Sequence, residues 1–355
     1  MLLPGHLPQF GTETTFTMST TSSPTVVVHA GKSFWKSWAF RGMAIILGFS
    51  VLLNMGLYAT FRDYFARSPE VSERFLSGNS STTQRIAVLR VSGTIMPPLT
   101  ERIIRQIEVA AEDERVKGVL LTIDSPGGLV ADSHQIYHAL EKLREKKPIS
   151  IQMKRLAASG GYYIAMGAGT KGQIFAEPTT WTGSIGVIIP RYDMSALVEK
   201  IGISSDPLKT GEFKDALSPF HPLTEAERKV WEEILNQSFE QFIELIDTNR
   251  DTLDREQARK LATGQIYTAR DARANGMIDE IGFEEDALAA LQKSLKLDQV
   301  RVVEYRSQPQ LVDLLLGSKT ENVTAAQWQA LVDATTPRAM FLFSWLPGLP
   351  QSPAL

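Results

Sequence analysis

A serine at a glycine-rich turn and a lysine in a second glycine-containing loop are the residues of this chain best suited to chemistry. Ser159 lies within the run Leu156–Ala165 and is followed directly by Gly160 and Gly161, so little side-chain bulk surrounds its hydroxyl. A serine hydroxyl is a weak nucleophile until a neighbouring base takes its proton. The sequence therefore predicts a nucleophile at Ser159 that depends on a base from elsewhere in the chain.

Lysine is the better candidate for that base, because no histidine is well placed. The chain contains 5 histidines, and only His221 lies near a motif, in a loop between Phe220 and Pro222. Lys214 stands in the segment Gly211–Asp215, downstream of the serine. A lysine must be neutral to accept a proton, and burial favours the neutral amine because it penalises the ammonium ion.

The neighbours of Lys214 act in opposite directions on its charge. Phe213 and the segment Ser218–Phe220 are expected to supply apolar cover, which favours the neutral amine. Asp215 favours the ammonium ion unless its carboxylate points away. Most lysines are solvated, so Lys214 taken alone would be interpreted as an ordinary loop lysine.

A second glycine-bearing turn, Ser125–Gly128, ends a predicted buried strand and begins a helix. Its proline fixes the chain direction, while Gly127 and Gly128 allow backbone N–H groups to point at a ligand. Such groups can stabilise the oxyanion of an acyl-transfer intermediate, with the Gly160 N–H as a second donor. An ordinary strand-to-helix turn has the same composition, so the turn alone leaves both interpretations open.

Two other chemistries available to these residue types are disfavoured. The nucleophile elbow Gly-x-Ser-x-Gly of lipases and esterases is not met, since Ala157 stands where its first glycine belongs. An isolated Ser-Gly-Gly would then be only a tightly packed turn. His134 and His138 have the spacing of zinc ligands, but the glutamate of His-Glu-x-x-His and a third ligand are missing, so no metal site is predicted.

Seven motifs, taken in order, resemble the Ser-Lys peptidase family that includes signal peptide peptidase A and protease IV. They are Asp124–Gly128, Ala157–Ala165, Thr182–Val187, Lys209–Asp215, Ser218–Phe220, Gly264–Ala269 and Gly276–Glu280. One such motif would be weak, whereas the ordered set is specific. The match extends from about Arg85 to Leu291, and the absence of an internal repeat fits the short, single-repeat type.

The resemblance implies a role for each candidate residue of a catalytic site. Ser159 is the nucleophile and Lys214 is the general base. Gly128 and Gly160 supply the N–H groups of the oxyanion hole, and Gly127 matches the family donor less well than Gly128 does.

A second serine, Ser184, matches the family serine that hydrogen-bonds the lysine amine and aims it at Ser159. Taken alone, Ser184 would be a turn serine that satisfies its own backbone. A few extra residues near 167–172 lengthen the spacing between the two serines, and they are expected to change loop shape rather than chemistry.

The resemblance also implies an α/β fold of the crotonase/Clp-protease type, with a parallel sheet covered by helices. The implied activity is a serine endopeptidase without a cofactor that degrades cleaved signal peptides left in the membrane. The implied assembly is a homo-oligomeric ring in which serine and lysine can come from neighbouring subunits. A non-catalytic membrane scaffold, an acyl-CoA hydratase and a peptidase for misfolded membrane proteins are the alternatives.

Apolar patterning independently predicts strands that alternate with helices, which is typical of a parallel sheet. The expected strands are 86–91, 116–123 and 149–153, and the expected helices are about 100–111 and 130–146. Thr224–Glu227 is a capping box for a long helix. The apolar segment 341–346 is expected to be a strand or an assembly contact.

The composition predicts that the domain is attached to a membrane by an N-terminal anchor. The uncharged run Gly42–Phe61 is long enough to span a bilayer, and three basic residues before it against two after it place the N-terminus inside. The net charge of −3 without a basic stripe argues against nucleic acid, and zero cysteines exclude a thiol nucleophile. The predicted parts are a disordered tail (1–41), an anchor (42–61), a polar linker (62–84), a peptidase domain (85–307) and a C-terminal extension (308–355).

Overall fold

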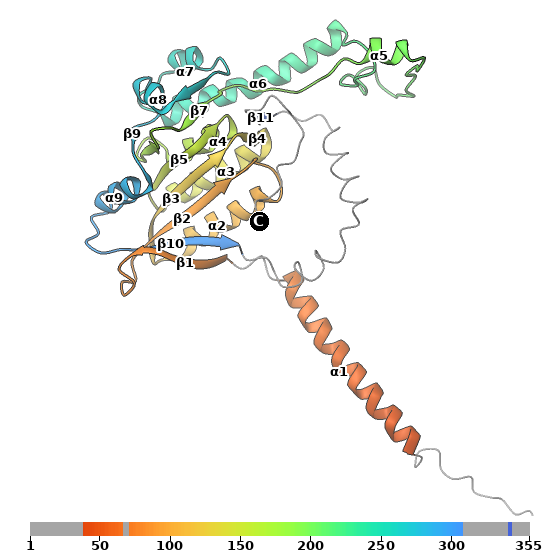
Figure 1. Ribbon diagram of the computed structural model, residues 1–355, viewed down its shortest axis with the longest axis vertical. Coiled ribbons are helices and arrows are strands. Elements are labelled where there is room, and N and C mark those ends of the chain that lie inside the picture. Colours follow the sequence, from red (N-terminus) through yellow and green to blue (C-terminus); the bar gives the residue numbers. More distant parts are fainter. Residues whose placement is uncertain (1–37, 67–70, 308–339, 343–355) are drawn as a thin grey trace, which may run out of the picture. The chain divides into compact units, whose positions relative to one another are not determined.

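The computed structural model describes residues 38–66, 71–307 and 340–342, and the chain falls into two units that divide after Arg67 (Figure 1). In the first unit, helix α1 (Trp38–Ala66) begins before the predicted anchor and ends after it. Its stretch Arg41–Tyr58 is long and apolar enough to cross a membrane, judged by length and composition. The rest of the predicted tail lies outside the described residues.

The second unit is built on a sheet that has nine strands among the described residues. The strand order is β1 (Val71–Gly78), β10 (Arg301–Ser307), β2 (Arg85–Ser92), β3 (Val116–Ser125), β5 (Ile149–Ala158), β6 (Ile174–Ala176) and β9 (Glu280–Ile281). Off this path, β7 (Trp181–Gly183) pairs with β5 and with β8 (Ile266–Thr268). The pairs β1–β10 and β7–β8 are antiparallel and the others are parallel. The predicted mostly parallel α/β sheet is confirmed.

Helices cover both faces of this sheet (Figure 1). They are α2 (Leu99–Glu112) and α3 (Val130–Arg144) on one face and α9 (Glu284–Ser294) on the other. Along β2, Leu89 joins the core beneath α2 and α3, while Ile86 packs in the cluster that contains Leu291 of α9. Because both faces are buried, the central strands need continuous apolar residues rather than alternation, which is the pattern that the sequence shows.

Part of the predicted linker is a strand. Residues 71–78 form β1, which pairs antiparallel with β10 and closes one edge of the sheet. An edge strand buries few of its side chains, and Glu73, Arg74 and Phe75 are exposed. Its polar composition therefore looked like a linker, although its backbone is bonded within the sheet.

The remaining helices of the second unit are short apart from one. They are α4 (Gly160–Ala165), a 3-10 turn (Met166–Ala168), α5 (Ser195–Lys200), α6 (Glu225–Asn249), α7 (Arg255–Leu261) and α8 (Ala269–Ala274). The capping box predicted for α6 is present: the Thr224 hydroxyl accepts from the Glu227 N–H, and the Glu227 carboxylate accepts from the Thr224 N–H.

Helix α6 is buried at one end only. Phe242 and Ile246 in its C-terminal half belong to the core, whereas Val230 and Ile234 in its N-terminal half are 39% and 38% exposed. Figure 1 shows this exposed half running outward beside the chain that leads to and from α5. We call residues 188–238 the arm.

Candidate active site

Ser159 lies in a strained turn between β5 and α4. Its backbone has φ +54° and ψ −112°, a conformation that residues with a side chain rarely adopt. The Ser159 N–H donates to the Gly183 carbonyl at 2.7 Å, and its own carbonyl accepts from the Tyr163 N–H at 2.8 Å. Such strain persists only where the surroundings fix it, and it concentrates at functional sites.

Ser184 follows the neighbouring parallel strand at the same level. The register pairs Ala158 with Gly183, so Ser159 and Ser184 occupy the next position along β5 and β7. Ser184 also has a positive φ of +50° and is 8% exposed, and its N–H donates to the Gln265 carbonyl. The structure therefore brings the two predicted serines together.

The turn after β3 directs the N–H groups of Gly127 and Gly128 to different partners. The Gly127 N–H already donates to the buried Ser125 hydroxyl at 3.1 Å. Strand β4 (Gly127–Leu129) bonds to Ile95 through the Gly127 carbonyl and the Leu129 N–H, both at 2.8 Å. Because successive residues of a strand face opposite edges, the peptide groups of Gly128 point the other way.

The two predicted oxyanion donors lie close together. A Cβ atom at Gly160 would come within 3.1 Å of the Gly128 nitrogen and 2.5 Å of the Ser133 hydroxyl. Only glycine fits where the backbone of α4 approaches β4 so closely. The carboxyl ends of β3, β5 and β7 thus collect a strained serine, a second serine and two backbone N–H groups.

Lys214 is not part of this collection in a single chain. It lies on the arm, in the loop between α5 and α6 (Figure 1). Its side chain is exposed and makes no hydrogen bond or ion pair with another residue that the structure describes. Phe213 and Phe220 are 44% and 46% exposed, so the predicted apolar cover does not form within one chain.

The carboxylate beside Lys214 is engaged elsewhere. Asp215 accepts a hydrogen bond from the Lys209 ammonium at 2.7 Å, and this contact holds the pKa of the Asp215 carboxyl below its ordinary value. The predicted conflict between Asp215 and a neutral Lys214 is therefore removed, because Lys209 serves as the partner.

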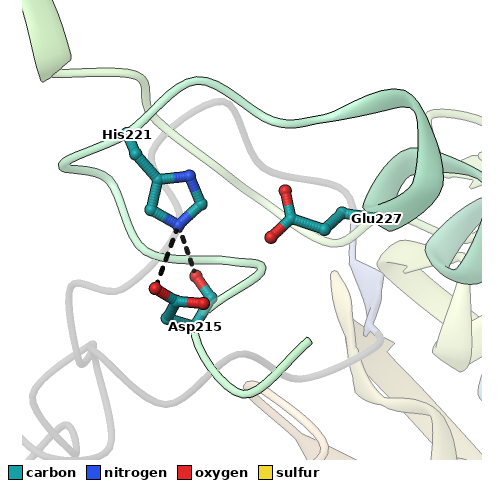
Figure 2. A group of neighbouring side chains, drawn as sticks. All are labelled: Asp215, His221 and Glu227. Carbon is teal, nitrogen blue, oxygen red and sulfur yellow. Dashed lines mark hydrogen bonds and ion pairs between the residues drawn. The ribbon is translucent and has the colours of Figure 1, made fainter. Parts of the chain in front are cut away.

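Figure 2 shows the side chains of Asp215, His221 and Glu227 grouped together, and their oxygen and nitrogen atoms could bind a divalent cation. The polar atoms of these three side chains already form hydrogen bonds within the protein. His221 contacts the Pro222 carbonyl through Nδ1 at 2.8 Å and the Asp215 carbonyl through Nε2 at 2.9 Å. The Glu227 carboxylate accepts from the backbone and hydroxyl of Thr224. We interpret the cluster as a hydrogen-bonded clasp of the loop that carries Lys214.

An aromatic cluster beside the serine was not predicted. Tyr163, Phe242 and Phe341 pack with ring centroids 4.8 to 4.9 Å apart. The Tyr163 hydroxyl lies 2.9 Å from Nδ1 of His134, which explains that histidine as a packing residue. The apolar residues were visible in the sequence, but nothing in their spacing showed that they meet.

The chain resembles known proteins at two levels, first in its architecture and then in its family. The Clp protease family matches residues 78–183, and the chain has the Clp-protease-like α/β architecture. A ClpP1 mutant from Listeria monocytogenes is a similar solved structure, with 19% identity, a TM-score of 0.39, and coverage of 57% of this chain and 94% of that chain.

Peptidase family S49 matches residues 141–298. A provisionally named signal peptide peptidase SppA of Enterococcus faecium is 35% identical over 302 residues, which cover 81% of this chain and 85% of that protein. A provisionally named protease of Synechocystis sp. is 34% identical over 72% of this chain and 91% of its own length. Protease 4 of Haemophilus influenzae is 33% identical over 64% of this chain and 37% of its own length. The chain belongs to peptidase family S49, and its relatives support a serine peptidase.

Proposed function

We propose that this protein is a membrane-anchored serine endopeptidase in which Ser159 is the nucleophile and Lys214 is the general base. The observation that carries the proposal is the strained conformation of Ser159, at the strand end where Gly128 and Gly160 meet. A residue held in this way presents its hydroxyl in one direction and needs little reorganisation during the reaction.

The proposed reaction begins when neutral Lys214 takes the hydroxyl proton as the Ser159 oxygen attacks a peptide carbonyl carbon. The N–H groups of Gly128 and Gly160 stabilise the resulting oxyanion. The lysine then donates its proton to the leaving amine, and the C–N bond breaks. Water, deprotonated by the same lysine, attacks the acyl-enzyme and releases the serine.

The lysine is proposed to come from a neighbouring subunit of a ring. The arm carries Lys214 among large apolar side chains that one chain leaves exposed. They are Ile188, Tyr192, Met194, Leu197, Ile201, Ile203, Leu208, Phe213, Phe220, Val230 and Ile234. Exposed apolar surface of this kind marks a protein interface, and burial there would favour the neutral lysine.

The proposed substrates are cleaved signal peptides that remain in the membrane. The names of relatives and the apolar helix α1 support this substrate class. We propose the same domain boundaries as above, except that the catalytic domain begins at Val71 instead of Arg85. Non-catalytic scaffolding is the second candidate, and the exposure of Lys214 in a single chain is the observation that favours it.

Peptide hydrolysis by single variants tests the proposal. Ser159→Ala and Lys214→Ala should each lower kcat/KM on an apolar peptide by about a thousandfold or more, because each removes a group that acts in the transition state. Ser294→Ala and Lys293→Ala, which change the same residue types on α9, should keep full activity. Full activity in Ser159→Ala would contradict the role proposed for Ser159, whereas a wild-type protein without peptidase activity would favour the scaffold.

The proposed topology places the N-terminus in the cytoplasm and the catalytic domain outside it. Because the chain has no cysteine, Ser81→Cys introduces a single thiol in an exposed turn of the second unit. This thiol should react with an impermeant reagent added to intact spheroplasts. Protection until the membrane is opened would reverse the orientation and leave the peptidase proposal standing.

A further inference from the structure

A polar amide stands near the middle of the apolar helix α1. Between Gly42 and Leu57, Ser50 and Asn54 are the only polar residues of the sequence. Asn54 lies within one turn of the midpoint of α1, so a membrane crossed by this helix holds the amide inside its hydrocarbon core. A polar group at that depth is costly, and it is retained where it has a partner or a function.

The amide of Asn54 is only partly satisfied by its own helix. Its Nδ2 donates to the Ser50 carbonyl at 2.7 Å, and the Ser50 hydroxyl, at 3.5 Å, is at best a weak second acceptor. An asparagine amide has two N–H donors and an acceptor oxygen, so one donor and Oδ1 are left over. Among the residues that the structure describes, Oδ1 has no hydrogen-bond partner.

Lipid acyl chains cannot supply these missing bonds. Every residue of α1 from Arg41 to Tyr58 is exposed in the single chain, so a lone helix in a membrane turns the Asn54 amide toward hydrocarbon. Acyl chains contain neither donors nor acceptors, and an amide without hydrogen bonds is penalised in such surroundings. The group that covers Asn54 must therefore both donate and accept a hydrogen bond within the membrane.

The side chains above and below Asn54 form a continuous stripe along the helix. They recur at alternating spacings of four and three residues, which places them on one face: Met43, Leu47, Ser50, Asn54 and Leu57. We call this the Asn54 face, and Ile45 lies on the opposite face. The spacing is that of the contact positions in a left-handed helix pair, and most membrane helix bundles pack at the matching angle.

We propose that α1 pairs through the Asn54 face with α1 of a second copy of this chain, and that the amide of each Asn54 donates to Oδ1 of its neighbour. Copies inserted in the same orientation hold Asn54 at the same depth, so the free donor of one meets the free acceptor of the next. Two helices exchange these bonds reciprocally, and a ring passes them from helix to helix. The inference rests on the proposed membrane anchor and does not depend on the catalytic residues.

Cysteine crosslinking of the full chain in carbonate-washed membranes tests the pairing, because the chain has no cysteine of its own. Leu47→Cys places a single thiol on the Asn54 face. Ile45→Cys is the matched control, because it places a thiol at nearly the same depth on the opposite face. On oxidation, Leu47→Cys should yield at least about tenfold more disulfide-linked dimer than Ile45→Cys, since a disulfide forms only between close Cβ atoms. Equal yields from the two faces would overturn the proposal.

A second substitution tests whether the amide itself holds the helices together. In the Leu47→Cys chain, Asn54→Leu should lower the dimer yield about tenfold, because it removes the bonds between the helices and keeps a side chain of similar size. Asn54→Gln should restore most of the yield, since glutamine also offers a donor and an acceptor. An unchanged yield in Asn54→Leu would contradict the role proposed for the amide.

The same membranes separate this inference from the proposed function. Retention of the chain in the washed membranes tests the anchor, and peptide hydrolysis before oxidation tests the peptidase. An active, membrane-bound chain that crosslinks equally on both faces would remove the helix pairing and leave the proposed function standing. A chain that washes off would overturn the anchor and the pairing together. A crosslinked product whose mass is not twice that of the chain would identify a different partner and likewise contradict the pairing of two copies.

Discussion

The turn that holds Ser159 and the loop that holds Lys214 are built in opposite ways. Ser159 is buried and strained, and its backbone is hydrogen-bonded to strand β7 and to helix α4. Lys214 is exposed on the arm, in a loop organised by local hydrogen bonds around His221. One half of the proposed dyad is thus prepared by the folding of a single chain. The other half lies among exposed apolar side chains of the kind that a partner covers.

The largest expected effect comes from mixing two inactive chains, one without the serine and one without the lysine. If Ser159 of one subunit works with Lys214 of its neighbour in a ring, co-assembled Ser159→Ala and Lys214→Ala chains should recover about a quarter of the wild-type activity. Half of the sites keep the serine, and half of those face a neighbour that keeps the lysine. Peptide hydrolysis by the purified mixed oligomer measures the recovery.

The same mixture also tests whether the serine and the lysine of one active site come from the same chain. If both groups came from one chain, every subunit in the mixture would lack one of them, and no activity would return. A mixture of two differently tagged Ser159→Ala chains is the matched control, because it assembles in the same way but contains no nucleophile.

The ion pair between Arg250, at the C-terminal end of α6, and Asp279 should have the next largest effect, which is on stability. Arg250 is 4% exposed and donates two hydrogen bonds to Asp279, at 2.8 and 3.0 Å, and another to the Gly276 carbonyl. Arg250→Ala leaves these acceptors without their partner. The free energy of unfolding should fall by about 3–5 kcal/mol, measured by chemical denaturation of the full chain in detergent.

An exposed pair nearby provides the control for that prediction. Arg273 and Glu280 lie 2.9 Å apart with both side chains about half exposed. Arg273→Ala should therefore cost less than about 1 kcal/mol, because solvent screens the interaction. An equal decrease in the free energy of unfolding in the two variants would mean that the pair of Arg250 and Asp279 does not stabilise the C-terminal end of α6.

The sequence predicted the serine side of the site better than the lysine side for a physical reason. Ser159, Gly128 and Gly160 lie in short motifs at strand ends, where local glycine content and the parallel order of strands determine their positions. The exposure of Phe213 could not be foreseen, because the sequence does not show which apolar residues one chain buries and which it leaves for a partner.

Long-range pairing was the other limit of prediction. The apolar segment 341–346 was expected to be a strand or an assembly contact; its first two residues lie in strand β11 (Met340–Leu342), and residues 343–346 lie outside the described part of the chain. Gly128, the partner of Phe341 in this strand, is roughly 200 residues away in the chain, and no local pattern encodes such a pairing. β1 was missed for a related reason, since an edge strand gains its stability from backbone bonds rather than from an apolar pattern.

The smallest expected effect concerns the clasp around His221. Carbonyl oxygens only accept hydrogen bonds, so His221 can donate to both Pro222 and Asp215 only when its ring carries two protons. The bond to the Pro222 carbonyl, together with the bond to Asp215 and the nearby carboxylates of Asp215 and Glu227, raises the pKa of His221 above its ordinary 6.5. The clasp is complete below pH 6.5 and is lost as the pH rises through the higher folded-state pKa.

Hydrogen exchange of residues 209–223, corrected for the intrinsic effect of pH, should show this loss directly. Protection in the wild type should fall as the pH rises above 6.5 and through the raised pKa of His221, because the ring then loses one of its two donors. His221→Gln should show weaker protection that does not change with pH, since an amide does not titrate in this range. His138→Gln is the matched control, because His138 lies on α3 and contacts only Glu141 among the described side chains. If wild-type protection is equally strong below and above that pKa, the loop that carries Lys214 is held by the Lys209–Asp215 contact and not by His221.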